Sequence, residues 1–128
     1  MSTLRLTTIS NQTGSASVPS DTVINGSAKA WVNFDGTGTV AIRASFNVSS
    51  ITDIGTGTYT VNFTTAFADT NYNVVMFNNA QGTNPPTAGN FSNQYVGGIG
   101  EFATGSVRVS SYSSGFTDSS LFCVTVFR

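Results

Sequence analysis

The side chains that most often perform chemistry in proteins are scarce in this sequence. Its 128 residues include no histidine, one cysteine and six acidic residues. A Ser-His-Asp triad and a His-liganded zinc or iron site both need histidine, so both are ruled out. One cysteine allows no intrachain disulfide, and we expect Cys123 to be a small buried residue of the last strand. We therefore predict a non-enzymatic chain with no catalytic residue, no cofactor and no bound metal.

The acidic residues are spread along the chain: Asp21, Asp35, Asp53, Asp69, Glu101 and Asp118. Each of the five aspartates stands beside Gly, Thr or Ser in a segment typical of a turn. There the side chain is expected to accept a hydrogen bond from the backbone two residues on. A calcium site needs several acids close in sequence, and that spacing is missing. Glycoside hydrolysis needs two facing carboxylates, and the sequence leaves open whether Asp35 and Asp53 converge or Glu101 finds a partner on another subunit.

Charge and composition exclude further classes of function. The formal net charge is −1 and only 9% of the residues are charged. The cations are Arg5, Lys29, Arg43, Arg108 and Arg128, and they do not cluster. Nucleic-acid binding needs a basic surface, and a membrane-surface helix needs a basic amphipathic run. We expect no nucleic-acid partner and no membrane insertion. The start, MSTLRLTT, lacks a secretory apolar region, which predicts that the chain is made and kept in a cytosol until assembly.

The elements that would position any site are predicted to be strands. Residues 27–63 contain three apolar runs that alternate with period two, and the connections carry Asp and two Gly. This pattern is typical of strands with one buried face, joined by tight hairpins. We predict a three-strand antiparallel meander here, with Val40, Ile42, Ala44, Phe46 and Val48 on one buried side.

Further strands follow the meander. Residues 72–77 are apolar on both sides, which predicts a strand in the middle of a sheet–sheet core. Residues 95–102 and 106–112 also alternate. The last run, 121–127, is apolar on both faces, so we expect it to be internal or covered by a partner. No segment shows helical periodicity. The fold class we predict is all-β, an antiparallel β-sandwich, jelly-roll-like, of seven or eight strands over residues 27–128.

Residues 1–26 contain too few apolar side chains for a core of their own. Residues 3–9 alternate weakly, as in an edge strand, and residues 11–20 read as an extended linker. The segment is either a loose tail or an arm that lies on a neighbouring subunit or docks to a larger assembly. The docking side chains of such an arm would be Leu4, Leu6, Ile9, Val18, Val23 and Ile24.

Two further groups of residues suggest contact surfaces. Residues 78–94 form the longest irregular stretch, and loops of this length are often functional. Its amides and aromatics suit either sugar recognition or a hydrated surface loop; the candidate ligand-binding residues are Asn79, Gln81, Asn84, Asn90, Phe91 and Tyr95. Trp31 falls opposite Val32 and Phe34, which places it in a second core or at a subunit interface. The candidate interface residues are Trp31, Phe122 and Phe127.

Several long segments of the sequence resemble a known family. AKAWVNFDGTGTVAIRASFNVSSITD, GTGTYTVNFTTAFADTNYNVV and the ending SLFCVTVFR resemble a module of tail-fibre and other surface structural proteins of tailed bacteriophages, marine ones in particular. TLRLTTISNQTG resembles the short leader of such virion proteins. The resemblance covers most of the chain. It implies structural attachment and assembly, commonly as a homotrimer, without a shared catalytic motif.

The resemblance sets the functional expectation. We expect a tail-fibre or adhesin component of the virion that docks to other virion proteins through residues 1–26 and presents loops to a host surface glycan. A capsid decoration (cement) protein that bridges capsid subunits is the main alternative. A hydrolase of envelope polysaccharide is a remote one, because function must be argued from a site.

Overall fold

The structure is a computed structural model that describes residues 3–79, 96–112 and 115–128. Its first elements are β1 (Thr8–Ser10), β2 (Ser17–Pro19) and α1 (Ser20–Gly26). The eight strands that follow are β3 (Ala28–Asp35), β4 (Ala41–Phe46), β5 (Val48–Gly55), β6 (Thr58–Phe63), β7 (Asn73–Asn79), β8 (Val96–Ala103), β9 (Ser106–Tyr112) and β10 (Leu121–Phe127).

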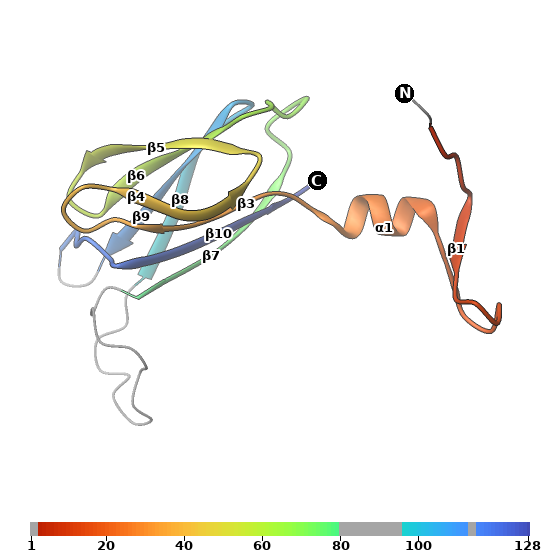
Figure 1. The fold of residues 1–128 in the computed structure, drawn as a ribbon. Helices are drawn as coiled ribbons and strands as arrows, with labels where there is room; N and C mark the ends of the chain where they lie inside the picture. Colours follow the sequence, from red (N-terminus) through yellow and green to blue (C-terminus); the bar gives the residue numbers. More distant parts are fainter. Residues whose placement is uncertain (1–2, 80–95, 113–114) are drawn as a thin grey trace.

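The eight long strands form two antiparallel four-stranded sheets that pack on each other (Figure 1). The strand order is β4-β3-β10-β7 in the first, called sheet 1 here, and β5-β6-β9-β8 in the second, called sheet 2. The expectation of an all-β fold is confirmed. No helix among the described residues has the length and apolar character that crossing a bilayer requires.

The core lies between the two sheets because alternate side chains of each central strand point inward. Burial follows a strict period of two in β6, β9 and β10. At one end of the core, the Phe34 and Phe122 rings stack at 4.7 Å, and Tyr59 meets both edge-on. Phe63, Phe67 and Tyr72 form a second aromatic group. Such aromatic pairs add roughly 0.5–1.5 kcal/mol each beyond the area they bury.

The predicted three-strand meander is wrong, because the chain changes sheets in the middle of it. β4 belongs to sheet 1, while β5 and β6 belong to sheet 2. The change occurs at Asn47, whose φ is +54°. Its amide Nδ2 donates to the carbonyls of Lys29 and Thr65, and its Oδ1 accepts from the Thr65 N–H at 2.8 Å. Apolar alternation runs straight through this corner, since an asparagine in the left-handed region does not interrupt it.

Strand positions in sheet 1 match the prediction only in part. β10 is internal, between β3 and β7, as its two apolar faces predicted. β7 was expected in the middle of the core but lies at the edge of its sheet. Val74 and Met76 pack against the core, whereas Val75 and Phe77 face outward. β4 is likewise an edge strand, and Ile42 and Phe46 are exposed rather than buried as predicted.

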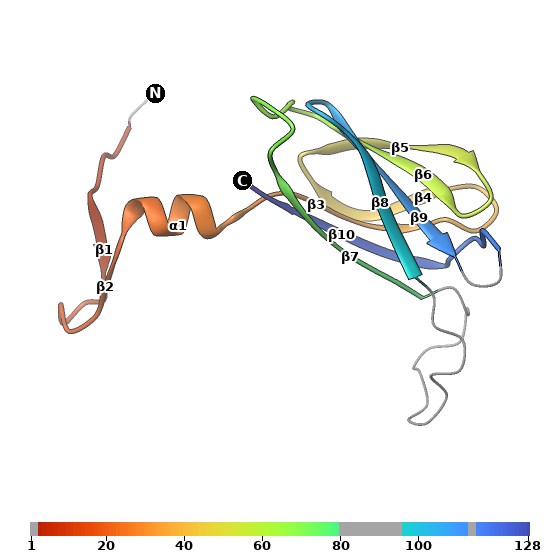
Figure 2. The ribbon, with the colours of Figure 1, turned by 180° about the vertical axis from the view of Figure 1, so that it is seen from behind.

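Residues 3–26 contain more regular structure than the sequence indicated. β1 and β2 form a short hairpin in place of the predicted linker, with the Asn11 N–H donating to the Ala16 carbonyl at 3.0 Å. Of the weakly alternating residues 3–9, only residues 8 and 9 belong to a strand, β1. The helix α1 has seven residues and none is buried, so it is too short for its periodicity to be recognised. Figures 1 and 2 show the hairpin and helix standing apart from the two sheets.

Candidate functional site

The outer face of sheet 1 is apolar, and strand register brings its residues into neighbouring rows. Trp31 pairs with Phe46 on one side and with Thr125 on the other, and Thr125 pairs with Val75. In the next row, Asn33 lies between Ala44 and Cys123 and is the polar member of the row, and Cys123 pairs with Phe77. Directly opposed residues of antiparallel strands point to the same face. We call this surface the apolar face; its members are Trp31, Ala44, Phe46, Val75, Phe77, Leu121, Cys123, Thr125 and Phe127.

The apolar face is open to solvent in the single chain. Trp31, Phe46, Val75 and Phe77 are between 39% and 59% exposed. Since a fully buried aromatic side chain covers about 150–250 Å², the three aromatic residues alone present roughly 300 Å² of ring surface. The largest apolar patch of a typical monomer is about 300–600 Å² and is often functional. With the aliphatic members included, the apolar face therefore has the size of an interaction surface.

Charged pairs border the apolar face. Near one end, Arg43 Nη2 lies 2.8 Å from Asp35 Oδ2, and Arg43 also donates to the amide oxygen of Asn33. Hydrogen bonds from the Thr37 hydroxyl and N–H, followed by the Arg43 charge, lower the Asp35 pKa. At the C-terminal end of β10, Arg128 pairs with Asp69. An apolar centre with a polar rim is the usual arrangement of a protein–protein interface.

The candidate interface residues have different outcomes. Trp31 and Phe127 lie on the apolar face, where Trp31 is 39% exposed. Phe122 was predicted there wrongly: it is 0% exposed and stacks on Phe34 in the core, because even-numbered residues of β10 point inward. Cys123 is also not the buried residue expected, since it is half-buried on the apolar face with the Asn33 amide donating to its Sγ at 3.6 Å.

The outer face of sheet 2 is polar instead. Its strands direct Thr52, Thr60 and Arg108 into one row and Thr58 and Ser110 into the next. Asn62 Nδ2 donates to the hydroxyls of Ser50 and Thr52 on the neighbouring strand. The two sheets thus share one core but present chemically opposite outer faces. A polar Ser/Thr surface is stable in water alone, whereas the apolar face gains free energy when it is covered.

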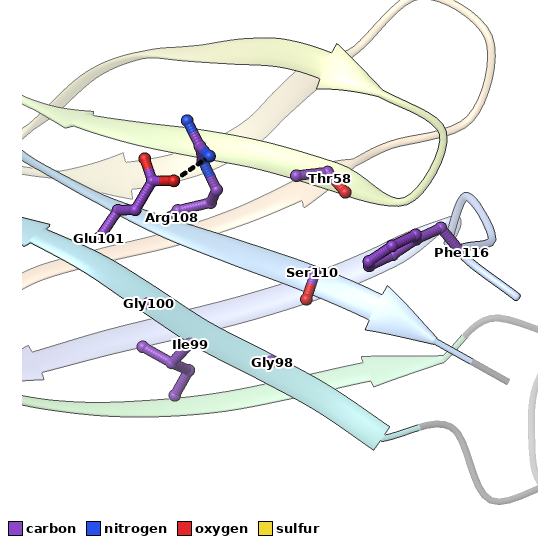
Figure 3. A pocket seen from close by; sticks show the side chains of 8 residues that line it. All are labelled: Thr58, Gly98, Ile99, Gly100, Glu101, Arg108, Ser110 and Phe116. Atoms are coloured by element: carbon purple, nitrogen blue, oxygen red, sulfur yellow. Dashed lines mark hydrogen bonds and ion pairs between the residues drawn. The ribbon is translucent and has the colours of Figure 1, made fainter.

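A hollow of about 320 Å³ lies on this polar face (Figure 3). Thr58, Ser110 and the glycines of β8 line it, the Glu101–Arg108 ion pair closes one side, and the Phe116 ring points into it from the loop before β10. Hydroxyls, an ion pair and one aromatic ring are the groups that bind the hydroxyls and apolar faces of a saccharide.

Backbone features keep the hollow open. A Cβ at Gly98 would lie 2.3 Å from the Ser110 hydroxyl oxygen, so glycine at this position lets the Ser110 side chain keep its present rotamer. Glu101 has a φ of +45° at the irregularity of pairing between β8 and β9. A non-glycine residue in the left-handed region is strained, and such strain occurs often at functional positions. Here it directs the Glu101 carboxylate to Arg108.

A buried polar network closes the end of the core near the aromatic trio. Asp118 Oδ1 accepts from the Gly57 N–H at 2.6 Å and lies 2.7 Å from the Tyr59 hydroxyl oxygen. The same hydroxyl is 2.8 Å from the Gly36 carbonyl, so one proton serves two acceptors. Burial, and then the Asp118 hydrogen bond, raise the pKa of Tyr59. The network joins three loops, and its role is to hold the two sheets together.

Most of the other aspartates accept the backbone hydrogen bond that is expected of an aspartate in a turn. Asp35, Asp53 and Asp69 each accept from the backbone N–H two residues on, at 2.8 to 3.0 Å, which confirms the expectation for them. Asp118 departs from it, since its partners lie about 60 positions away in sequence. Across residues 3–79, 96–112 and 115–128, no three His, Cys, Asp or Glu side chains gather as a metal site would need.

The structure describes all of the predicted docking residues but almost none of the predicted ligand-binding residues. Leu4, Leu6, Ile9, Val18, Val23 and Ile24 are all exposed, between 41% and 81%. Gln81, Asn84, Asn90, Phe91 and Tyr95 lie outside the described residues, and of Asn79 only the backbone is described, at the end of β7. Sequence reasoning missed Phe46, Val75 and Phe77 as surface residues. The available signal was that β7 is apolar on both sides, which also fits an edge strand whose outer face is covered by a partner.

A comparison of the chain with protein-family models, with curated proteins and with solved structures found no match.

Proposed function

We propose that this chain is a structural protein of a phage virion, a tail-fibre or adhesin component that works as an assembled homotrimer. The observation that carries the proposal is the contrast between the two outer faces. An exposed apolar face beside a polar one suits a subunit that covers one sheet and presents the other. The sequence resemblance to phage surface proteins supplies the virion setting. In this proposal the fold is a jelly-roll-like β-sandwich, and the protein moves from the host cytoplasm to the virion.

The presented surface in this proposal is the outer face of sheet 2. Its hollow offers hydroxyls, the Glu101–Arg108 pair and the Phe116 ring to a host surface glycan. The structural role itself does not depend on this hollow.

Cryo-electron microscopy of the intact particle tests the virion role. We expect density for this fold at the tail, with the apolar face against another subunit. Absence of the chain from purified particles would refute the proposal. Density on the shell would favour the capsid decoration alternative, which the six exposed apolar side chains of residues 3–26 also suit because a projecting segment can bridge subunits.

A glycan array tests the adhesin role separately. The wild-type protein is compared with Arg108→Ala and Phe116→Ala, which remove groups of the hollow, and with Thr52→Ala as a control on the same sheet face. We expect both hollow variants to lose binding at least about tenfold while the control keeps it. Equal binding by all four proteins would assign any glycan contact to another surface.

A further inference from the structure

We propose that residues 3–26 of one copy pack on the apolar face of a second copy, so that subunits are joined by exchanged N-terminal segments. The inference deepens the proposed assembly role and rests on it. The partner of the apolar face is then a second copy of this chain, and the exposed apolar residues of the segment are buried against that face.

The first observation is that both surfaces are apolar and uncovered within the same chain. The residues of the apolar face named above are up to 59% exposed, and Leu4 and Ile24 of the segment are 81% and 57% exposed. α1 has no buried residue and the residues of β1 and β2 are all exposed. A hairpin and a seven-residue helix with no core of their own are only marginally stable alone. Their regular structure therefore needs a supporting surface.

The second observation is that the segment is directed away from its own sheets. The Ser27 N–H donates to the Val23 carbonyl at 3.1 Å, and the Ser27 hydroxyl donates to the Ile24 carbonyl at 3.0 Å. Lys29, the second residue of β3, also donates to the Ile24 carbonyl and to the Ser27 hydroxyl. These bonds fix the junction between α1 and β3. Figures 1 and 2 show the result, with the segment projecting beyond the start of β3.

The third observation concerns area. A stable protein–protein interface buries about 800 Å² on each partner. The aromatic residues of the apolar face supply roughly 300 Å², and the flanking aliphatic side chains and the charged rim raise this toward the required size. The segment offers six exposed apolar side chains spread over 24 residues to meet this surface. Each copy gives one segment and receives one, and a threefold rotation between copies would close these contacts into the trimer of the proposed function.

Cys123 allows a direct test, because it lies on the apolar face and is the only cysteine of the chain. In the full-length Val23→Cys variant, we expect a short thiol–thiol cross-linker to join Cys123 of one copy to the introduced cysteine of another. Denaturing gels would then show covalent oligomers. The Thr52→Cys variant, with its cysteine exposed on the polar outer face of sheet 2, is the matched control and should stay uncross-linked.

Other occupants of the apolar face give different products. Face-to-face pairing of two copies would cross-link the wild-type protein through its two Cys123 thiols, which overturns the proposal. Packing of the segment on its own sheet would give a cross-linked monomer of altered mobility, which overturns it as well. Oligomers without a Cys123 link to the segment would leave the assembly role standing and reject the segment as the occupant.

A mixing experiment tests the exchange without cross-linking. Val23→Asp/Ile24→Asp disables the segment, and Phe46→Asp/Phe77→Asp disables the apolar face. We expect sedimentation velocity to show each variant alone as a monomer, and their mixture as a hetero-oligomer, because one intact segment then meets one intact face. The dissociation constant of each variant alone should rise at least about tenfold. Unaltered self-association of the segment variant overturns the proposal; Ser in place of Asp serves where a variant does not fold.

Discussion

Replacement of Asp118 by alanine should be among the most destabilising single changes in this chain. The carboxylate accepts from the Gly57 N–H at 2.6 Å and from the Tyr59 hydroxyl at 2.7 Å, and Tyr59 is 0% exposed. A hydrogen bond to a charged group contributes about 1.5–3 kcal/mol, and a buried donor left without a partner costs a similar amount. Asp118→Ala should therefore lower the free energy of unfolding by about 3–5 kcal/mol, a large share of the roughly 5–15 kcal/mol of a typical domain.

Two variants separate the hydrogen bonds from the charge and from turn formation. Asp118→Asn keeps an acceptor oxygen in place and should lose less, about 1–2 kcal/mol. Asp53→Ala is the matched control, because Asp53 accepts a single exposed bond from the Gly55 N–H and should lose about 1 kcal/mol or less.

Urea denaturation followed by circular dichroism and by Trp31 fluorescence measures these differences at fixed protein concentration. The double variant Tyr59→Phe/Asp118→Ala completes a thermodynamic cycle, in which a coupling of about 1–3 kcal/mol is expected for groups in contact. An Asp118→Ala protein that unfolds within 1 kcal/mol of the Asp53→Ala control would refute the assignment of the network as the closure of the core.

Three further changes have defined outcomes. Above pH 10, the ordinary tyrosine pKa, Tyr59 loses its proton in the unfolded chain but keeps it in the folded protein, so the free energy of unfolding should fall as the pH rises. The fall should be less steep in Tyr59→Phe, and equal slopes of the two proteins in alkaline denaturation would contradict this. Gly57→Ala should lower the free energy of unfolding by more than about 3 kcal/mol, because φ is +64° and the new Cβ would lie 2.5 Å from the Thr117 nitrogen. Gly105→Ala is the control in thermal unfolding; it has open space around it and should lower the free energy of unfolding by about 1 kcal/mol or less. At the corner between sheets, Asn47→Gly keeps the positive φ and loses the side-chain bonds, so it should be less destabilising than Asn47→Ala; the reverse order of melting temperatures would reject the role given to φ.

Period-two alternation located most strands because burial in this fold follows it. The predicted run 121–127 coincides with β10, and 106–112 coincides with β9. Alternation does not say which sheet a strand joins. The corner at Asn47 depends on hydrogen bonds to Lys29 and Thr65, each 18 residues away, and such contacts leave no local pattern.

The candidate surfaces were less predictable than the strands. The position of Trp31 followed from alternation, but the apolar face also needs β4 and β10 on either side of β3, and β7 beyond β10, which is a property of the strand order. Likewise, the hollow combines β6, β8 and β9 with Phe116 from a later loop. The short helix α1 was missed because seven residues hold about two turns, too few for a hydrophobic period to stand out.

The central place of β10 in sheet 1 also determines when the protein can fold during synthesis. β3 pairs with β10, and the contact between Asn33 and Cys123 spans 90 residues. β10 follows every other strand in the sequence, so the ribosome makes it after the strands that need it on both sides. Until then, β3 and β7 have no shared neighbour, and their apolar residues are available to chaperones. A nascent chain stopped before residue 121 can pair β3 with β4, but it lacks the strand that joins this hairpin to β7. Sheet 1 and the core that it shares with sheet 2 are therefore completed late in translation, and interrupted chains stay open to proteolysis.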